Sequence, residues 1–203
     1  MTPPVSCESI NTNPDFRPLS SVANLRVDLR YATAANFMGR DMYSPLDCAW
    51  AHRDALDGLT RAIAWLTRQR RNAHLCVLDA LRPQRVQVAM WAALEGTPLT
   101  DYLAPPERGS IHSFGMAIDA TLVDDDGQEF DMGTAFDDMT ELSHPGLEAA
   151  FLKAGALDAE HVSNRHLLRS AMQRGGFNGI GTEWWHFDCG DRTLVRATYA
   201  RVL

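Results

Sequence analysis

The stretch from Ser110 to Val123 reads SIHSFGMAIDATLV. From Gly115 onward its apolar residues continue almost without a break, which predicts a buried β-strand. Successive side chains of a strand point to opposite faces. Two sets therefore separate: Met116, Ile118, Ala120 and Leu122 on one face, and Ala117, Asp119 and Thr121 on the other. An acid in such a strand is costly to bury without a partner, so Asp119 is a candidate functional residue.

Helical and strand patterns precede this stretch. Apolar residues recur at helical spacing within 47–71 and predict an amphipathic helix, at Leu56, Leu59, Ile63 and Leu66. Residues 74–81 are typical of a buried strand that delivers Arg82 to its end, and Pro83 then opens a helix that runs to Gly96. A short strand is expected at 25–31, and residues 1–20, rich in Pro, Ser and Asn, are expected to form an irregular surface arm.

Further helical and strand patterns follow the 110–123 stretch. We expect a short strand at 129–132, a helix at 161–174 that Gly175 and Gly176 stop, and an aromatic strand at 182–189. Helices come first and several strands later, an order that predicts an α+β fold. Residues 1–203 are expected to form a single domain with a central antiparallel sheet flanked by helices.

The composition argues against several kinds of partner. The 203 residues carry a net charge of −7 and no basic run, so there is no electrostatic footprint for nucleic acid or an anionic membrane. No stretch is long and apolar enough to span a bilayer. The first residues lack the basic and apolar regions of a signal peptide, which favours the cytoplasm; a leader removed before residue 1 would instead indicate the periplasm. The sequence carries no signal of oligomeric state.

The four cysteines, Cys7, Cys48, Cys76 and Cys189, are widely spaced and form no CxxC pair. A thiolate zinc site is therefore not expected. Cys76 lies in an apolar run and is expected to be buried as a small hydrophobic residue. In an oxidising compartment the four cysteines would allow two disulfides.

Two histidines complete a candidate metal site with Asp119. A catalytic zinc takes three protein ligands from His and carboxylate and keeps one position open for water. His112, Asp119 and His186 supply that set, and Gly115 permits a sharp entry into the strand that folds His112 back toward Asp119. The metal would lower the pKa of its water to roughly 7. Glu183, three residues before a ligand, is the candidate for accepting the proton.

The spacing of Glu183 and His186 raises a difficulty. Residues three apart in a regular strand point to opposite faces, so these two side chains would diverge unless a bulge or a strand end near Trp184 re-aims them.

Single residues also have plainer interpretations. A histidine in a loop, such as His112, is more often a surface residue, and Arg82 at a strand end is compatible with an ordinary salt bridge.

Several motifs together resemble a known family. Ser-x-His-x-x-Gly-x-Ala-x-Asp at 110–119, followed by Glu-x-Trp-His at 183–186, resembles the zinc D,D-peptidases, which share this kind of zinc site with hedgehog-type domains. Further blocks at 28–39, 79–83, 131–137, 164–172 and 176–177 are similar to the D-alanyl-D-alanine dipeptidases of the VanX type. The blocks run in order from residue 28 to 188, which makes the resemblance specific.

The resemblance implies a zinc metallopeptidase with a zinc D,D-peptidase or hedgehog-like fold that hydrolyses D-alanyl-D-alanine, in cell-wall precursor turnover or in resistance to antibiotics that bind this terminus. It implies one zinc ion per chain, on His112, Asp119 and His186. Glu183 would be the general base and acid, and Arg82 would stabilise the developing oxyanion. It also implies three substrate-binding residues: Asp137 for the ammonium group, Tyr31 beside it, and Ser110 for the terminal carboxylate.

Departures from the family pattern bear on substrate preference. Phe114 stands where a polar or basic residue is common, and Asp-Ala-Leu-Arg at 79–82 stands where Asp-Gly-Tyr-Arg also occurs. Two alternative functions remain: a D,D-carboxypeptidase acting on longer wall peptides, or a non-catalytic, hedgehog-like zinc-binding module. The 131–137 block argues against the first, because an ammonium-binding carboxylate would close the site to a longer chain. Glu183 and Arg82 argue against the second, because a binding module needs neither.

Overall fold

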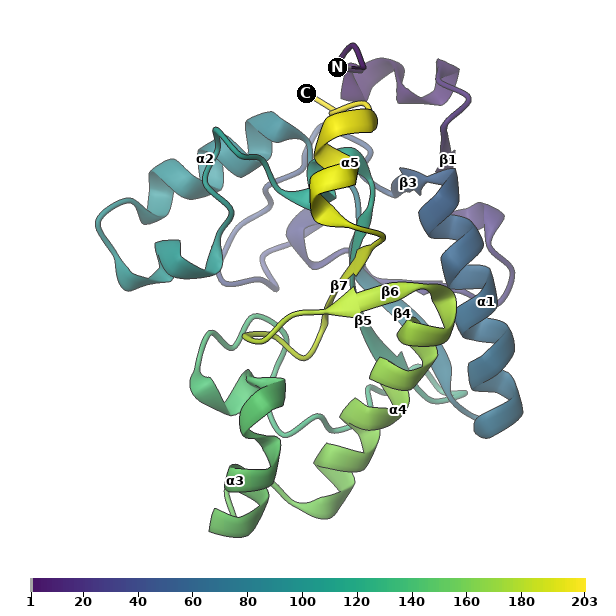
Figure 1. Cartoon of the computed structure of the whole chain (residues 1–203), viewed down its shortest axis with the longest axis vertical. Helices are drawn as coiled ribbons and strands as arrows, with labels where there is room; N and C mark the ends of the chain where they lie inside the picture. Colours follow the sequence, from purple (N-terminus) through teal and green to yellow (C-terminus); the bar gives the residue numbers. More distant parts are fainter. Residues whose placement is uncertain (1) are drawn as a thin grey trace.

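The computed structural model describes residues 2–203 (Figure 1). Its central sheet has five strands in the order β2-β4-β5-β7-β6. These strands are β2 (Arg26–Val27), β4 (His74–Asp79), β5 (Ala117–Val123), β7 (His186–Cys189) and β6 (Phe177–Gly179). Neighbouring strands run antiparallel except for the edge pair β2 and β4, which is parallel. The predicted α+β fold with a central antiparallel sheet is confirmed, apart from this edge pair.

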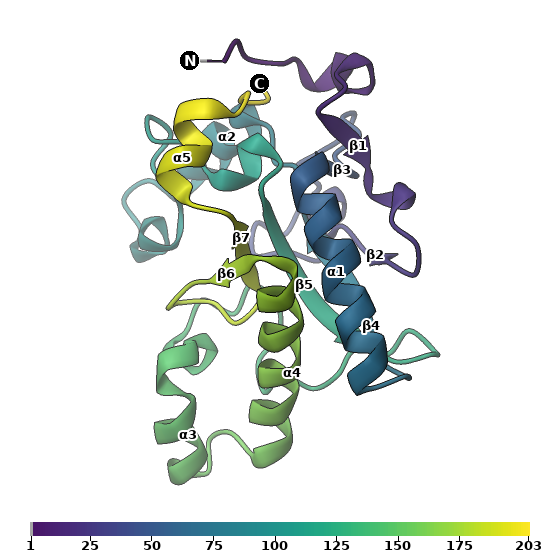
Figure 2. The ribbon, with the colours of Figure 1, turned by 45° about the vertical axis from the view of Figure 1, so that its right-hand side comes forward.

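Two long helices, α1 (Arg53–Gln69) and α4 (Ala159–Gly175), lie side by side and share one hydrophobic core with the central strands (Figure 2). They approach closely where Gly58 meets Gly175, since a Cβ on Gly58 would lie 2.9 Å from the Gly175 carbonyl oxygen. Helix α1 buries the four residues predicted from its periodicity, and Gly176 ends α4 in the left-handed conformation with φ of 92°. Both helix predictions are confirmed.

Three further helices complete the fold: α2 (Gln84–Leu94), α3 (Glu148–Ala154) and α5 (Arg192–Thr198). As predicted, α2 begins directly after Pro83 and ends just before Gly96. Among the helices of residues 2–203, none has the length and apolar character needed to cross a membrane. All four cysteines are buried and free, so the prediction for Cys76 is confirmed.

Residues 1–20, predicted as an irregular arm, are more ordered than that, although residue 1 lies outside the described residues. Residues 7–12 form a 3-10 helix, and β1 (Phe16–Pro18) pairs antiparallel with β3 (Trp50–His52) in a second, two-stranded sheet. Four apolar side chains of this segment are buried: Cys7, Ile10, Phe16 and Leu19. Their burial anchors a segment whose Pro, Ser and Asn content is typical of a loop.

Three predicted strands are shorter than expected. In the 25–31 segment only Arg26–Val27 forms a strand, because a 3-10 turn begins at residue 30. In the 129–132 segment a single bridge joins Glu129 to Val123. In the 182–189 segment the strand begins only at His186, which leaves residues 182–185 in an irregular approach to β7.

Candidate active site

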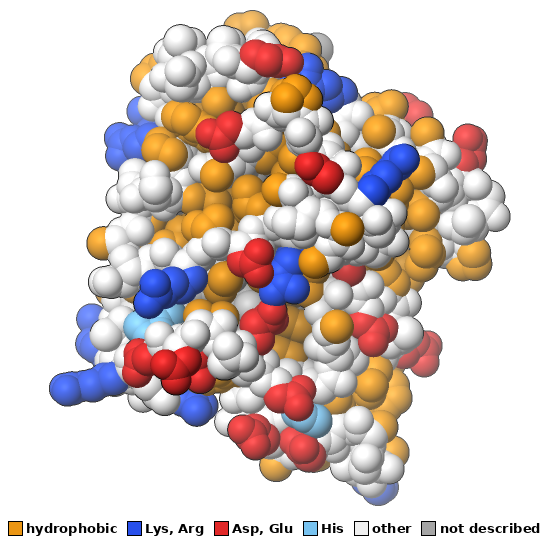
Figure 3. Space-filling view, turned by 180° about the vertical axis from the view of Figure 1, so that it is seen from behind, with side chains coloured by type: hydrophobic (Ala, Val, Ile, Leu, Met, Phe, Trp, Pro, Cys, Tyr) orange, Lys and Arg blue, Asp and Glu red, His pale blue; other side chains and the backbone are white. Residues whose placement is uncertain are grey.

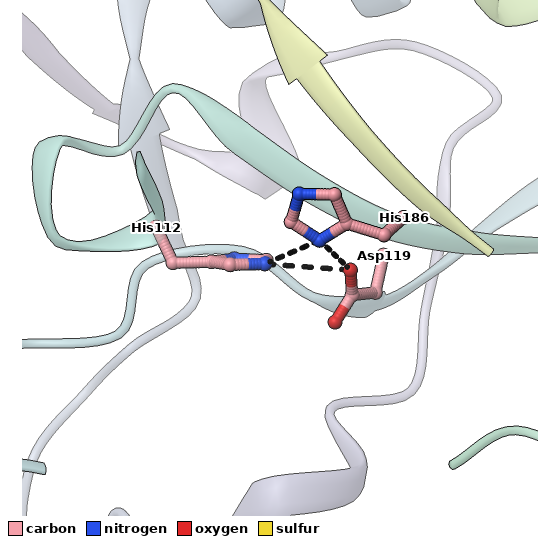
Figure 4. A group of neighbouring side chains, drawn as sticks. All are labelled: His112, Asp119 and His186. Atoms are coloured by element: carbon pink, nitrogen blue, oxygen red, sulfur yellow. Dashed lines mark hydrogen bonds and ion pairs between the residues drawn. The ribbon is translucent and has the colours of Figure 1, made fainter. Parts of the chain in front are cut away.

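The three predicted metal ligands lie together at the centre of the sheet (Figure 4). Asp119 in β5 is paired directly with His186, the first residue of β7, so the two are neighbours across the sheet. His112 reaches them from a 3-10 turn at Ile111–Phe114. The Asp119 Oδ1 atom lies 2.9 Å from His186 Nδ1 and 3.3 Å from His112 Nε2, and the two ring nitrogens are 3.2 Å apart. Three potential ligand atoms thus converge on one point.

The turn that carries His112 is fixed at both ends. At its start, the Ser110 side-chain oxygen accepts a hydrogen bond from the His112 backbone N–H at 3.3 Å. At its end, Gly115 has φ of 64°, a left-handed conformation that favours glycine. A Cβ at Gly115 would lie 2.7 Å from the backbone nitrogen of His52. The predicted role of Gly115 in turning the chain into β5 is confirmed.

The outer ring nitrogens of both histidines are held by hydrogen bonds. His112 Nδ1 lies 2.8 Å from the carbonyl oxygen of Ala80, which can only accept, so Nδ1 carries the proton and Nε2 presents a lone pair. His186 Nε2 lies 3.1 Å from Asp188 Oδ1, and Asp188 is also ion-paired with Arg192. Bonds of this kind select the tautomer and ring orientation of metal-binding histidines. Nε2 of His112 and Nδ1 of His186 are therefore the nitrogens that would face a metal bound here.

The charges of His112, Asp119 and His186, called the trio below, compensate one another. Burial raises the pKa of Asp119, but the charges and hydrogen bonds of His112 and His186 outweigh it and hold this pKa below its usual range. Burial lowers the pKa of His186, and its hydrogen bonds to Asp119 and Asp188 outweigh that effect and raise it. Two histidines gathered around a buried carboxylate form a site suited to a cation.

Glu183 lies in the irregular segment that precedes β7. Its side chain is only 8% exposed and lines the same cavity as the trio. Because β7 begins at His186, the alternation of a regular strand does not apply between residues 183 and 186. The strand end thus resolves the difficulty raised by their spacing. Burial raises the pKa of Glu183 to about 7, and the positive charge of His186 offsets part of that rise.

Arg82 is buried and oriented by neighbours on both sides. Its Nε and Nη2 donate to Asp79 Oδ2 at 3.1 and 2.6 Å, and its Nη1 donates to Gln87 Oε1 at 3.3 Å. Asp79 pairs with Asp119 across β4 and β5, which brings Arg82 Nη2 to 3.8 Å from Asp119 Oδ2. Hydrogen bonds therefore fix the orientation of the guanidinium beside the candidate metal ligands.

Asp137 is a further acid of the cavity. It has φ of 63°, an uncommon conformation for a residue other than glycine. Its carboxylate accepts the Tyr31 hydroxyl and the Phe37 backbone N–H, both at 3.1 Å. Burial raises the pKa of Asp137 to about 8, against these hydrogen bonds. A half-buried acid without an ion-pair partner is suited to an ammonium group.

One cavity of about 320 Å³ contains all these groups. Its lining includes every predicted site residue: Tyr31, Arg82, Ser110, His112, Asp119, Asp137, Glu183 and His186. This volume lies at the lower end of the range for small-molecule sites. The structure therefore brings together residues that lie as far as 155 positions apart in the sequence (186 − 31).

Several lining residues were not predicted as site residues from the sequence, among them Phe37, Asp188, Arg192 and Arg108. A signal for two of them exists. Asp188 lies two residues after His186 in the same strand, and Arg192 lies four residues after Asp188. The position of Arg108 depends on how the 103–110 loop folds, and the sequence has no local pattern that shows it.

Comparisons with known proteins find similarity to D-alanyl-D-alanine dipeptidases. The model of a family described as D-ala-D-ala dipeptidase (Peptidase_M15) matches residues 15–202. A D-alanyl-D-alanine dipeptidase of Escherichia coli (strain K12) is 38% identical over 168 residues, which cover 81% of this chain and 79% of the relative. A D-alanyl-D-alanine dipeptidase of Enterococcus faecium is 32% identical over 187 residues, or 82% of this chain and 86% of the relative.

Proposed function

Since this chain belongs to the D-Ala-D-Ala dipeptidase family of metallopeptidases, we propose that it hydrolyses free D-alanyl-D-alanine to two molecules of D-alanine. The observation that carries the proposal is the convergence of His112, Asp119 and His186 with the buried Glu183 in one cavity. Two histidines, one carboxylate and a nearby acid are the parts that a metal-dependent hydrolase requires.

The proposed cofactor is one zinc ion per chain. The donor set fits zinc, because imidazole nitrogen and carboxylate oxygen are its usual catalytic ligands, and no thiolate lies in the trio. His112 Nε2, His186 Nδ1 and an oxygen of Asp119 would hold the ion. Bound there, zinc supplies Lewis acidity toward the peptide carbonyl and makes water a stronger acid.

Glu183 is the proposed proton carrier. Its carboxylate takes a proton from the attacking water and passes it to the nitrogen of the scissile amide. The water oxygen bonds to the carbonyl carbon, the C–N bond breaks, and the second alanine leaves as a free amine. A pKa of about 7 suits both halves of this transfer at neutral pH.

Arg82 and Asp137 have complementary roles in this proposal. The Arg82 guanidinium, fixed by Asp79, stabilises negative charge that develops on the carbonyl oxygen. Asp137, with Tyr31 beside it, binds the free ammonium group of the first residue. An ammonium group held by Asp137, which Tyr31 and Phe37 fix by hydrogen bonds, would close this end to a longer chain, and this favours a dipeptidase over a carboxypeptidase.

A substrate panel tests the proposal. The zinc-loaded protein is assayed with D-Ala-D-Ala, L-Ala-L-Ala and an N-blocked tripeptide that ends in D-Ala-D-Ala, each with and without chelator. We expect chelator-sensitive hydrolysis of D-Ala-D-Ala and little turnover of the other two substrates. Preference for the blocked tripeptide would replace the dipeptidase with a carboxypeptidase, and no hydrolysis of any substrate would favour a binding module.

A further inference from the structure

Two of the four free cysteines are in contact outside the catalytic cavity. Cys7 lies in the 3-10 helix at residues 7–12 and Cys48 lies shortly before β3, and their side chains form a hydrogen bond with each other. The Cys7 Sγ atom also lies 3.9 Å from the backbone oxygen of Asp47, the residue before Cys48. Both side chains belong to one hydrophobic cluster. The proposed reaction gives this pair no role.

The other two cysteines, Cys76 on β4 and Cys189 on β7, belong to separate hydrophobic clusters. Strand β5 lies between β4 and β7 in the sheet. Two strand spacings, about 10 Å, therefore separate their backbones, which is more than the roughly 7 Å between Cα atoms that a disulfide can span. Of the two disulfides that four cysteines would allow, the structure thus favours one, between Cys7 and Cys48.

The surroundings shift the pKa values of the two thiols in opposite directions. The hydrogen bond from Cys48 lowers the pKa of Cys7, and the charge of Arg85 adds to this effect, while burial opposes it. The same hydrogen bond, together with burial, raises the pKa of Cys48 above its usual range. Cys7 is therefore the thiol that ionises first, and a thiolate is the nucleophile in disulfide exchange.

Access to the pair depends on movement of the surface turn around Cys7. Cys7 and Cys48 are 4% and 2% exposed, but the residues on either side of Cys7, Ser6 and Glu8, are exposed. Opening a short surface helix costs less free energy than opening the strands of a central sheet, where the other two cysteines lie. We therefore expect this pair to react before the other two thiols.

We propose that Cys7 and Cys48 are a redox-active pair that forms a disulfide by exchange with a small-molecule disulfide such as oxidised glutathione. The Cys7 thiolate attacks one sulfur of the reagent, and the first reagent thiolate leaves. Cys48 then loses its proton and attacks the Cys7 sulfur of this mixed disulfide, which releases the second reagent thiolate. The two cysteine thiols are oxidised to one disulfide, the reagent disulfide is reduced, and the two protons end on the two reagent thiols.

Residues 43–48 connect this pair to the candidate active site. Tyr43 is buried and donates from its hydroxyl to Asp79, and Asp79 accepts two hydrogen bonds from Arg82. The segment lies at the back in Figure 1 and so on the face shown in Figure 3, where hydrophobic side chains gather above the centre. A disulfide at Cys48 would fix one end of this segment and involves no candidate metal ligand.

Oxidation of the zinc-loaded protein tests the proposal. The protein is incubated with oxidised glutathione at mildly alkaline pH, the remaining thiols are alkylated, and digestion with mass spectrometry locates each disulfide. We expect one linked pair of peptides, which joins Cys7 to Cys48. The Tm should rise by about 5–10 °C above that of the reduced protein, because the bond closes a loop of 41 residues (48 − 7). A phosphine reductant should reverse both changes.

Alanine variants assign the effect to the pair. Cys7→Ala and Cys48→Ala should each abolish the rise in Tm, whereas Cys76→Ala, at a similarly buried thiol on β4, is the matched control and should keep it. Mapping of the parent needs no variant, so a variant that does not fold leaves the test intact. A bond to Cys76 or Cys189 would overturn the inference, as would a folded parent in which Cys7 and Cys48 stay unlinked, as free thiols or as separate glutathione adducts. These measurements use no substrate, so their outcome is independent of the proposed function.

Discussion

Two groups of acids share the cavity and differ in their partners. Asp119 is buried between two histidines, and their charges hold its pKa below the usual range despite burial. Glu183 is buried and Asp137 half-buried, neither has a cation in direct contact, and loss of solvation raises their pKa values to about 7 and about 8. The difference comes from partners, because burial alone acts in the same direction on all three.

The direction of the pKa shift distinguishes two kinds of binding site. The trio around Asp119 is suited to a permanently bound cation. Hydrogen bonds to Ala80 and Asp188 hold the ring nitrogens of His112 and His186 that point away from the proposed metal position. Glu183 and Asp137 can bind or release a proton near neutral pH, and a bound ammonium group would favour the ionised carboxylate. The proposed metal centre and the proposed substrate site thus differ in the direction in which the surroundings shift the pKa of a carboxyl group.

The largest effect is expected from His112→Ala. Removing one of three protein ligands should release the metal and reduce dipeptide hydrolysis to the level of a metal-free sample. Zinc content after dialysis, measured with activity, checks this outcome. His166→Ala, at an exposed position of α4, is the control. Full zinc occupancy in His112→Ala would remove this residue from the metal centre.

Glu183→Gln should distinguish the acid proposed to carry a proton from the acid proposed to bind the metal. Zinc content is expected to stay at the parent level, while kcat falls by about two to four orders of magnitude, the usual size of general-base catalysis. In the parent, kcat/KM should decrease as pH falls below about 7, since Glu183 then binds a proton, and this limb should be absent in the variant. Glu160→Gln, exposed in the first turn of α4, is the control. Loss of zinc along with activity would contradict the role assigned to Glu183.

Asp188→Asn tests whether the hydrogen bond from His186 Nε2 to Asp188 increases the affinity for the metal. The amide binds the outer nitrogen of His186 less strongly, and zinc affinity should fall by about tenfold to a hundredfold. Competition with a chromogenic chelator measures the affinity, and Asp126→Asn in the exposed 124–127 turn is the control. An affinity within twofold of the parent would show that Asp188 does not position His186.

The smallest effect concerns stability. The folded-state pKa of Asp137 is raised to about 8 from its ordinary value of 3.8, so ionisation destabilises the folded state increasingly as pH rises through this window. Asp137→Asn should therefore stabilise the metal-free protein by about 1–2 kcal/mol near pH 9 and by much less near pH 4. Urea unfolding at both pH values measures the gain. A gain that is equal at both values would contradict the raised pKa.

The sequence predicted what local periodicity and motif spacing encode. The helical spacing in α1, the strand at β5 and the glycine turn before it were predictable, because each depends on residues close together in the chain. The eight site residues were predictable because they lie within motif blocks that resemble a family. Residue chemistry and spacing indicated Asp119, as an acid within an apolar strand, and then His112, His186 and Glu183 as its candidate partners. The roles of Arg82, Asp137, Tyr31 and Ser110 came only from the resemblance.

Features that depend on tertiary contacts were not predictable. The N-terminal segment is anchored by Phe16 and Leu19, whose burial depends on partners elsewhere in the fold. The start of β7 at His186, which frees Glu183 from strand alternation, depends on its pairing with β5. The approach of Arg108 to α5 also depends on distant segments. Propensity does not encode such contacts.

A crystal structure of the zinc-loaded protein with anomalous data at the zinc edge tests the central claim most directly. The account predicts one zinc peak per chain, bound by His112 Nε2, an oxygen of Asp119 and His186 Nδ1, with an open position toward Glu183. A zinc peak on other residues, or coordination through the nitrogens now bonded to Ala80 and Asp188, would contradict it.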